Sequence, residues 1–239
     1  YVPYPIPEGN FGFHQDGASL TMEYAYQDWT LAQLAKKLDR EEDYRYFLDR
    51  SHNYRNVYDS TTTWMRPKDI HGTWLADFDP YTYEHGFNES NGAQSTWFVP
   101  HDIPGLAQLM GGKEKAVQKL NAQFEQAEKL GFTSGTAHDK ERHPEYRRIP
   151  INYGNQPSIQ TAAIFTLLDR PDLTHYWTRK VVEKAFSGLS PATGYNGDED
   201  QGLMGSLAVL LKMGMFQMRA GCASRPEYEI GSPLFERVT

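Results

Sequence analysis

The sequence predicts a mainly α-helical fold in which helices pair and stack into a toroid. Two observations carry this prediction. Apolar residues recur at helical spacing in several separate segments of the 239-residue chain. The loops between these segments are alternately short and long, as expected when helices pair and the long connections gather at one end. No sequence repeat of fixed period is visible, which disfavours a solenoid.

The predicted helices follow one another along most of the chain. They span, in chain order, about residues 20–38, 41–58, 102–110, 113–130, 157–168, 172–187 and 200–213. Ser19 can cap the first helix, whose apolar positions are Leu20, Tyr24, Leu31, Leu34, Ala35 and Leu38. The second helix reads as the antiparallel partner of the first. Pro157 suits a first helical turn, where a missing amide hydrogen costs nothing.

Long segments between the helices lack helical periodicity. Residues 60–101 carry turn residues and aromatics over an excursion of about forty residues, and loops of that length are usually functional. Residues 131–154 are polar and irregular. The tail, residues 215–238, mixes Gly, Pro and short apolar runs, so we expect short β-strands there and in the long loops.

Composition excludes several classes of protein. The net charge is -7, and no run of Lys or Arg exceeds two residues, so nucleic acid is not an expected partner. No apolar stretch approaches the ~18 residues of a membrane-spanning helix. The single cysteine, Cys222, excludes an internal disulfide. The chain begins at Tyr1 and reads as a processed or excised piece.

Aromatic residues make up 13% of the chain, and many lie in Gly- and Asn-rich loops. This combination suits a site that stacks on sugar rings, whose C–H faces are weakly apolar while their edges carry hydroxyls. An aromatic-rich core would give the same composition. Sugar binding is the favoured interpretation.

A short turn concentrates three acidic residues, Asp198, Glu199 and Asp200, between Gly197 and Gly202. Carboxylates that lie so near one another repel, so a bound cation or a reaction that needs a base would explain why three occur in one turn. An apolar helical stretch follows at once, and the amides and dipole of a helix start favour negative charge. An acidic helix cap is an equally valid interpretation of the turn alone.

Glu89 is a second carboxyl of interest because it is the only acid between Glu84 and Asp102 and lies among Asn, Gln, Trp and His. A carboxyl in such surroundings, with no neighbouring Lys or Arg, is placed to act as a general acid. A loop glutamate that caps a backbone turn is the alternative.

Together these features favour glycoside hydrolysis. That reaction needs a protonated carboxyl on the leaving oxygen and an ionised carboxylate that handles water or the anomeric carbon. Glu89 fits the first role, and Asp198 with Asp200 fits the second. The amide-rich segment 152–160 precedes a predicted helix, and its amide oxygens suit Ca²⁺ or sugar hydroxyls. Zinc motifs and EF-hand loops are missing from the sequence.

These motifs resemble glycoside hydrolase family 92, the calcium-dependent exo-α-mannosidases. The matching segments follow the family's order and cover nearly the whole chain. They are Gly12–Trp29, Arg50–Asp59, Trp64–Lys68, Phe87–Gln94, Val99–Asp102, Gly154–Ser158, Gly197–Met204 and Ile230–Phe235.

The resemblance implies an (α/α)6 toroid behind an N-terminal β-sandwich. Residues 1–239 would be part of a single (α/α)6 catalytic domain and would hold only its later helices. The β-sandwich and the early barrel helices would be absent from this chain. Whether the chain alone turns over substrate stays open.

The resemblance also implies site residues for an inverting cleavage of terminal α-linked mannose. Glu89 would be the general acid, and Asp198 and Asp200 would activate water. Substrate binding would fall to Arg66, Trp97, His101 and Gln156. A Ca²⁺ ion would hold the mannose O2 and O3, with Asn155 and Gln160 as candidate ligands.

One departure from the family bears on specificity. Many members that cleave α-1,2 links carry Glu at the position of Gln156, so the sequence leaves α-1,2 and α-1,3 links both open. The expected partners are a mannose-containing oligosaccharide and the remainder of the full-length enzyme, and family analogy implies a secreted or periplasmic location. Alternatives are an inverting glucosidase on the same toroid, a non-catalytic carbohydrate-binding fragment, and a helical scaffold without a sugar site.

Overall fold

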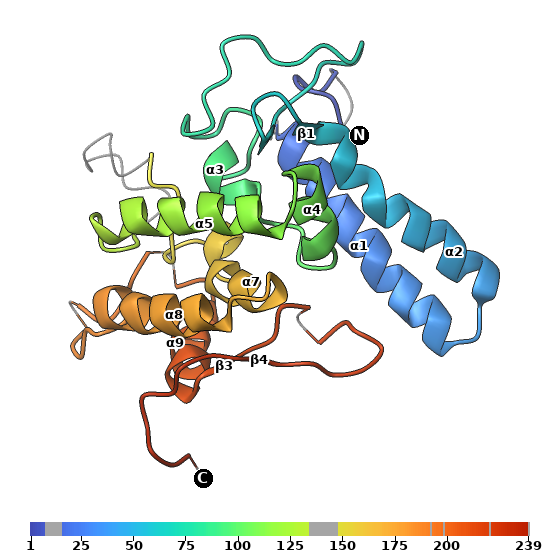
Figure 1. Ribbon diagram of the computed structural model, residues 1–239. Coiled ribbons are helices and arrows are strands. Elements are labelled where there is room, and N and C mark those ends of the chain that lie inside the picture. The colour runs from blue at the N-terminus through green and yellow to red at the C-terminus, as the bar shows by residue number, and fades with distance from the viewer. Residues whose placement is uncertain (8–15, 134–147, 192, 198, 220, 239) are drawn as a thin grey trace.

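The computed structural model confirms the mainly helical prediction (Figure 1). It describes residues 1–239 apart from 8–15, 134–147, 192, 198, 220 and 239. The α-helices are α1 (Gly17–Lys37), α2 (Glu41–Arg50), α3 (Gly92–Ser95), α4 (Ile103–Leu109), α5 (Lys113–Glu128), α7 (Thr161–Leu167), α8 (Pro171–Ala185) and α9 (Leu203–Met213). The 3-10 helices are η1 (Ser51–Val57) and η2 (Gln156–Ser158). Within the described residues, no helix combines the length and apolar character that crossing a membrane requires.

Short strands occur in the long excursion and in the tail, as predicted, except that β1 begins at Tyr58, the last residue of the predicted helix 41–58, which is therefore too long. In the first ladder, β1 (Tyr58–Asp59) pairs antiparallel with β2 (Trp64–Met65), with Tyr58 opposite Met65. In the second, β3 (Met215–Phe216) pairs antiparallel with β4 (Glu229–Ile230).

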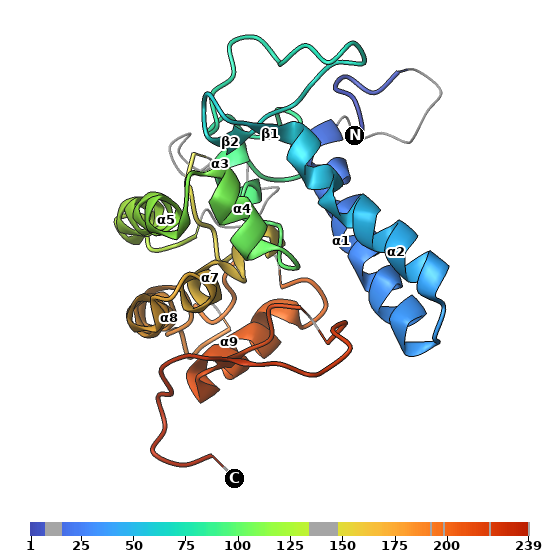
Figure 2. The same cartoon turned by 45° about the vertical axis from the view of Figure 1, so that its right-hand side comes forward.

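The helices α1 and α2 form an antiparallel pair that extends away from the stack of α5, α7 and α8 (Figures 1 and 2). The prediction of this pair is confirmed, but three of the apolar positions that predict α1 lie at the surface. They are Leu31, Leu34 and Leu38, which are 43%, 55% and 62% exposed. The buried apolar positions are Ala18, Met22, Ala25, Trp29, Ala32 and Ala35. Alanines on this face let neighbouring segments approach α1 closely, so its buried face is not marked by large apolar side chains.

Ser19 does not cap α1, contrary to the prediction. The helix begins earlier, at Gly17, so Ser19 already lies in its first turn. A Cβ on Gly17 would overlap the carbonyl oxygen of Pro3, which explains why the helix can begin there only with glycine. The Ser19 hydroxyl is therefore available for a tertiary contact, described below.

The core lies between α5, α7 and α8 and is dominated by aromatic rings. Phe124 on α5 stacks on Trp177 of α8, with ring centroids 5.1 Å apart and an interplanar angle of 30°. Phe132, Tyr153 and Phe165 also contact Phe124, and all three are fully buried. Offset aromatic pairs of this kind contribute about 0.5–1.5 kcal/mol each beyond their buried area. Many of the chain's aromatics thus serve the core.

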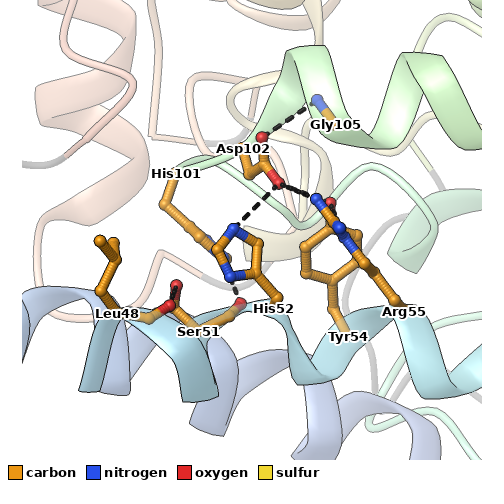
Figure 3. A network of polar contacts seen from close by, with 8 residues as sticks. All are labelled: Leu48, Ser51, His52, Tyr54, Arg55, His101, Asp102 and Gly105. Atoms are coloured by element: carbon orange, nitrogen blue, oxygen red, sulfur yellow. Dashed lines mark hydrogen bonds and ion pairs between the residues drawn. The ribbon is translucent and has the colours of Figure 1, made fainter. Parts of the chain in front are cut away.

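Asp102 joins η1 to α4 (Figure 3). Its Oδ1 accepts a hydrogen bond from the Gly105 amide at 3.0 Å and so caps α4. Its Oδ2 accepts hydrogen bonds from the Tyr54 hydroxyl at 2.7 Å and from Nη2 of Arg55 at 3.2 Å. The Asp102 carboxylate therefore fixes the start of α4 and holds α4 against η1.

The acidic turn leads into α9, as predicted, but the helix begins at Leu203 and not at residue 200. Asp200, Gln201 and Gly202 have φ angles of 51°, 59° and 96°. Left-handed backbone cannot continue into a right-handed helix. Pro157 likewise falls in η2, and α7 begins only at Thr161.

Candidate functional site

A cleft of about 470 Å³ brings three of the predicted site residues together. Glu89, Asn155 and Gln156 line it. Its walls come from α1, from the segment around residues 88–98, and from the start of η2. The remaining lining residues are Asp16, Ser19, Leu20, Met22, Glu23, Tyr24, Gln27, Asn88, Ser95, Phe98 and Pro157. The cleft therefore combines apolar surface with hydroxyl, amide and carboxyl groups.

Glu89 is held in the cleft wall by its own backbone and that of its neighbour. Its φ of +46° is unusual for a residue other than glycine. The Glu89 carbonyl accepts a 2.6 Å hydrogen bond from Nδ2 of Asn155, across 66 residues of sequence. The Asn88 amide donates to the Ser19 hydroxyl at 2.9 Å. Contacts from two different elements thus fix the loop through its backbone, and no hydrogen bond or ion pair joins the Glu89 carboxyl to another described residue.

The single turn α3 follows the Glu89 loop in the sequence and holds it in place through hydrogen bonds. Asn91 caps α3, its Oδ1 accepting a hydrogen bond from the Gln94 amide at 3.0 Å. The side-chain amides of Asn91 and Gln94 both donate to the Ile149 carbonyl, at 3.1 and 2.8 Å. Ser90 and Ser95 share a buried hydrogen bond of 2.6 Å. The polar residues that follow Glu89 in the sequence therefore form its scaffold.

The acidic turn meets the cleft through Gln156. Nε2 of Gln156 donates a hydrogen bond to Oδ2 of Asp200, 44 residues away in sequence. The backbones also pack directly, because a Cβ on Gly197 would overlap the Gly154 carbonyl. Asp198, the other predicted water-activating residue, lies outside the described residues. The amide-rich segment thus contacts both carboxylate-bearing loops, through Asn155 on one side and Gln156 on the other.

Glu199 has the role of a helix cap. Its Oε1 accepts a hydrogen bond from the Gly205 amide at 3.2 Å, and its carbonyl accepts one from the Met204 amide. Glu199 therefore acts as the helix cap that was the alternative interpretation of the acidic turn, whereas the Asp200 carboxylate contacts Gln156.

The predicted calcium ligands, Asn155 and Gln160, offer amide oxygens of the right chemistry, but they are only two. Asn155 and Gln160 are both 4% exposed. The Asn155 Oδ1 already accepts a hydrogen bond from the Gln156 amide. Nε2 of Gln160 donates a hydrogen bond to the Pro157 carbonyl, so the Gln160 Oε1 is the atom that could bind calcium. Calcium takes six to eight oxygen ligands. Among the described residues, no three His, Cys, Asp or Glu side chains lie close enough to hold a metal ion. These two amides alone fall short of a calcium site.

Arg66 does not line the cleft. Its Nη1 forms a 2.9 Å ion pair with Oδ2 of the buried Asp59, and its Nε donates to the Leu75 carbonyl at 3.0 Å. Burial raises the pKa of Asp59, but the hydrogen bonds from Arg66, Thr61 and Thr62 outweigh it and leave the pKa lowered. Arg66 therefore braces the β1–β2 hairpin where substrate contact was expected.

Trp97 and His101 are likewise enclosed, at 1% and 8% exposure. The Trp97 indole donates a 2.6 Å hydrogen bond to Oε1 of Gln123. The His101 ring stacks on Tyr26 and meets Tyr54 edge-on. These contacts take up the surfaces through which a sugar was expected to bind.

His101 carries its proton on Nε2, which donates to the Ser51 carbonyl at 2.9 Å (Figure 3). Its Nδ1 is buried and has no hydrogen-bond partner among the described residues. Burial lowers the pKa of His101 to about 4, although the Ser51 hydrogen bond and Asp102 oppose the shift. The ring is therefore neutral at physiological pH.

Sequence reasoning missed the wall that α1 contributes. Ser19, Glu23 and Gln27 all line the cleft. Their spacing of four residues is visible in the sequence and marks one face of a helix.

Comparisons with known proteins show the family and agree with the fold. The glycosyl hydrolase family 92 catalytic domain matches residues 1–239. Among solved structures, the family GH92 inverting mannosidase BT2199 from Bacteroides thetaiotaomicron VPI-5482 is 31% identical, with a TM-score of 0.77 over 99% of this chain. The family GH92 α-mannosidase BT3965 from Bacteroides thetaiotaomicron, in complex with mannoimidazole, is 30% identical, with a TM-score of 0.76 over 91% of this chain.

One curated relative is similar over part of the chain. An uncharacterized secreted glycosidase of Arthroderma benhamiae is 28% identical over 158 residues, which are 66% of this chain. The matched region spans 16% of that relative, 31% of BT2199 and 28% of BT3965. The chain therefore corresponds to a minor part of each of these proteins.

Proposed function

The chain belongs to the glycosyl hydrolase family 92 catalytic domain, and we propose that it forms part of an exo-α-mannosidase that releases terminal mannose with inversion. The observation that carries the proposal is the cleft that gathers Glu89 with Asn155 and Gln156, the latter hydrogen-bonded to Asp200. The solved relatives support the substrate class, since one is described as an α-mannosidase and another as an inverting mannosidase.

Glu89 is the proposed general acid. It lies half-buried in the cleft wall, its backbone carbonyl is held by Asn155, and its carboxyl has no hydrogen-bond partner among the described residues. A carboxylic acid there would donate its proton to the glycosidic oxygen as the bond to the anomeric carbon breaks. The leaving sugar then departs as a neutral alcohol.

Asp198 and Asp200 are proposed to take the proton of the attacking water. Inversion requires that water enter from the face of the sugar opposite the acid, with about 6.5–9.5 Å between the two carboxyl groups. The contact of Asp200 with Gln156 supports this role because it aims one carboxylate of the turn toward the cleft. Gln156 would orient that carboxylate and contact the substrate.

Calcium remains a proposal with Asn155 and Gln160 as partial ligands. When bound, the ion would supply positive charge and oxygen coordination for the mannose O2 and O3. Because the two amides are too few, its other ligands would come from water, from substrate or from elsewhere in the full-length enzyme. The mannose-containing oligosaccharide and the remainder of that enzyme, including a β-sandwich and early barrel helices, are the proposed partners.

We also infer that the protein is secreted or periplasmic. The support is the secreted glycosidase that is 28% identical to this chain. Fractionation of the source cells tests the inference, and activity confined to the cytoplasm would contradict it.

The proposed function is tested by following the product with proton NMR. The full-length natural protein is incubated with α-1,2- and α-1,3-mannobiose and with the matching glucosides. The anomer formed is read on methyl α-mannoside, whose cleavage releases a single mannose, because the reducing-end sugar of a mannobiose is already an anomeric mixture. We expect β-mannose to appear first and to mutarotate later, and initial α-mannose would contradict inversion. Cleavage of glucosides alone would favour the glucosidase alternative, and binding without cleavage would favour a carbohydrate-binding fragment.

A further inference from the structure

One wall of the cleft is a polar stripe on α1. Ser19, Glu23 and Gln27 follow one another at intervals of four residues and line the same cleft as Glu89 and Gln156. Residues four apart on a helix lie on one face, each about one turn beyond the last. The stripe therefore presents a hydroxyl, a carboxyl and an amide in a row along the cleft.

Ser19 fixes the stripe relative to Glu89. Its hydroxyl accepts a 2.9 Å hydrogen bond from the amide of Asn88, the residue that precedes Glu89. The amides of Ala18 and Ser19 also donate to the Gly86 carbonyl, at 3.2 and 3.4 Å. The first turn of α1 and the Glu89 loop are thus one connected unit, and the residues one and two turns further along α1 keep a defined position beside the loop.

Glu23 differs from Ser19 because nothing in the described part of the chain pairs with its carboxyl by an ion pair or a hydrogen bond. The side chain is half-buried, and its neighbours in the wall include Leu20, Met22 and Phe98. Burial raises the pKa of Glu23. A half-buried carboxyl without a partner destabilises a fold. Stability therefore does not explain this residue, whereas a ligand in the cleft would.

We propose that the Glu23 carboxyl, with the Gln27 amide one turn along, binds hydroxyl groups of the glycan in this cleft and determines which sugar it accepts. The inference rests on the proposed function, which places a glycan there. Carboxyl and amide groups both accept hydrogen bonds from hydroxyls. A site built to bind a hydroxyl in this way rejects an analogue that lacks it. Glu23 is thus a residue of specificity, and Glu89 remains the acid.

Binding is measured in the full-length natural protein carrying Glu89→Gln, so that mannobiose is not consumed during calorimetry. Added to this background, Glu23→Ala is expected to weaken mannobiose binding by about 10- to 100-fold, the loss typical of a hydrogen bond to a charged group. Glu23→Gln, which keeps the shape and can still accept, is expected to weaken it less. Glu42→Gln, an exposed charge change on α2, is the matched control and should not alter binding.

Two further readouts separate this role from a structural one. The melting temperature of Glu23→Gln should be unchanged or higher, because the substitution removes an unpaired half-buried charge. A panel of monodeoxy mannobioses identifies the contacted hydroxyl. Removal of that hydroxyl should weaken binding to the protein with Glu23 but not to Glu23→Ala, and the two losses should not add.

The outcomes distinguish this inference from the proposed function. Normal mannoside cleavage with unchanged binding in Glu23→Ala would overturn the inference and leave the function intact. Mannobiose binding that depends on Glu23 in a protein that never cleaves mannosides would support the inference and overturn the function. A protein without affinity for any mannobiose would overturn both, and a lowered melting temperature with unchanged binding would assign Glu23 to the fold.

Discussion

At the scale of single residues, burial decides which predicted groups can act on a substrate. Glu89 and Gln156 reach the cleft, whereas Arg66, Trp97 and His101 are taken up by internal partners. A motif identifies which residue types stand together in the sequence. It does not say whether a side chain faces a cleft or the core, because that depends on partners such as Asp59 and Gln123 that lie far away along the chain.

His101 should make the fold sensitive to acid. Its pKa is lowered from 6.5 to about 4 by burial, so the unfolded chain binds a proton in this range and the folded chain does not. Stability is therefore lost as pH falls from about 6.5 toward 4, by up to about 3 kcal/mol at ~1.4 kcal/mol for each pH unit. Denaturant unfolding across this range measures the effect.

The variant His101→Gln removes the titrating ring and should flatten this part of the pH dependence, while it lowers stability at pH 7 through lost packing against Tyr26 and Tyr54. His52→Gln is the control, since His52 lies nearby on η1 but is 41% exposed at its side chain. An identical pH dependence in wild type and His101→Gln would refute this account of the residue.

At the scale of elements, the helices could be predicted well and their ends and faces less well. The boundaries of α5 and α8 agree closely with the periodicity of the sequence, whereas the second predicted helix, 41–58, is an α-helix only as far as Arg50 and continues as the 3-10 helix η1 to Val57. The start of α9 could not be predicted, because the left-handed backbone at Asp200 and Gln201 occurs at residues other than glycine. The buried face of α1 does not follow its large apolar residues, because its alanines pack closely while Leu31, Leu34 and Leu38 remain exposed.

The contact between the acidic turn and the amide segment depends on Gly197. Its φ is +71°, and a Cβ there would overlap the Gly154 carbonyl. Gly197→Ala should therefore push the turn away from Asn155 and Gln156. We expect a loss of stability of about 1–3 kcal/mol from the backbone strain and a loss of kcat larger than 10-fold, since positioning errors of this size are costly in catalysis.

Gly202→Ala is the matched control for this prediction. Its φ is +96°, but nothing lies within 4 Å of the added Cβ, so it tests the backbone strain without the collision. Thermal unfolding and steady-state kinetics of both variants separate the two effects. If Gly202→Ala loses as much activity as Gly197→Ala, the contact with Gly154 is not what places the turn.

At the scale of the whole molecule, the site depends on contacts between distant segments. Glu89 meets Asn155 across 66 residues, and Gln156 meets Asp200 across 44. The chemistry of these groups could be predicted from local sequence, and the meeting of their loops from the pattern of paired helices. The Asn155–Gln156 bridge between the two loops could not be predicted, because nothing local in an amide-rich segment specifies its partners.

Calcium removal tests a further property of the whole enzyme. Because Asn155 and Gln160 supply too few oxygens, we expect weak or no calcium binding by residues 1–239 alone and measurable binding by the full-length protein. Calorimetry with calcium checks this. A chelator should abolish mannoside cleavage, and added calcium should restore it. Full activity in chelator would refute the cofactor proposal and favour the glucosidase alternative.

The central claim is that Glu89 is the acid of a mannosidase cleft, and leaving-group dependence tests it most directly. Glu89→Gln is compared with wild type on mannobiose and on dinitrophenyl α-mannoside, with Glu84→Gln as control. Glu84 lies in the same loop, also at positive φ, and is exposed. For Glu89→Gln we predict a loss in kcat/KM of about 10²–10⁴-fold on mannobiose and near-normal cleavage of the activated substrate, whose leaving group needs no proton. Equal losses on both substrates, or an equal loss in Glu84→Gln, would contradict the claim.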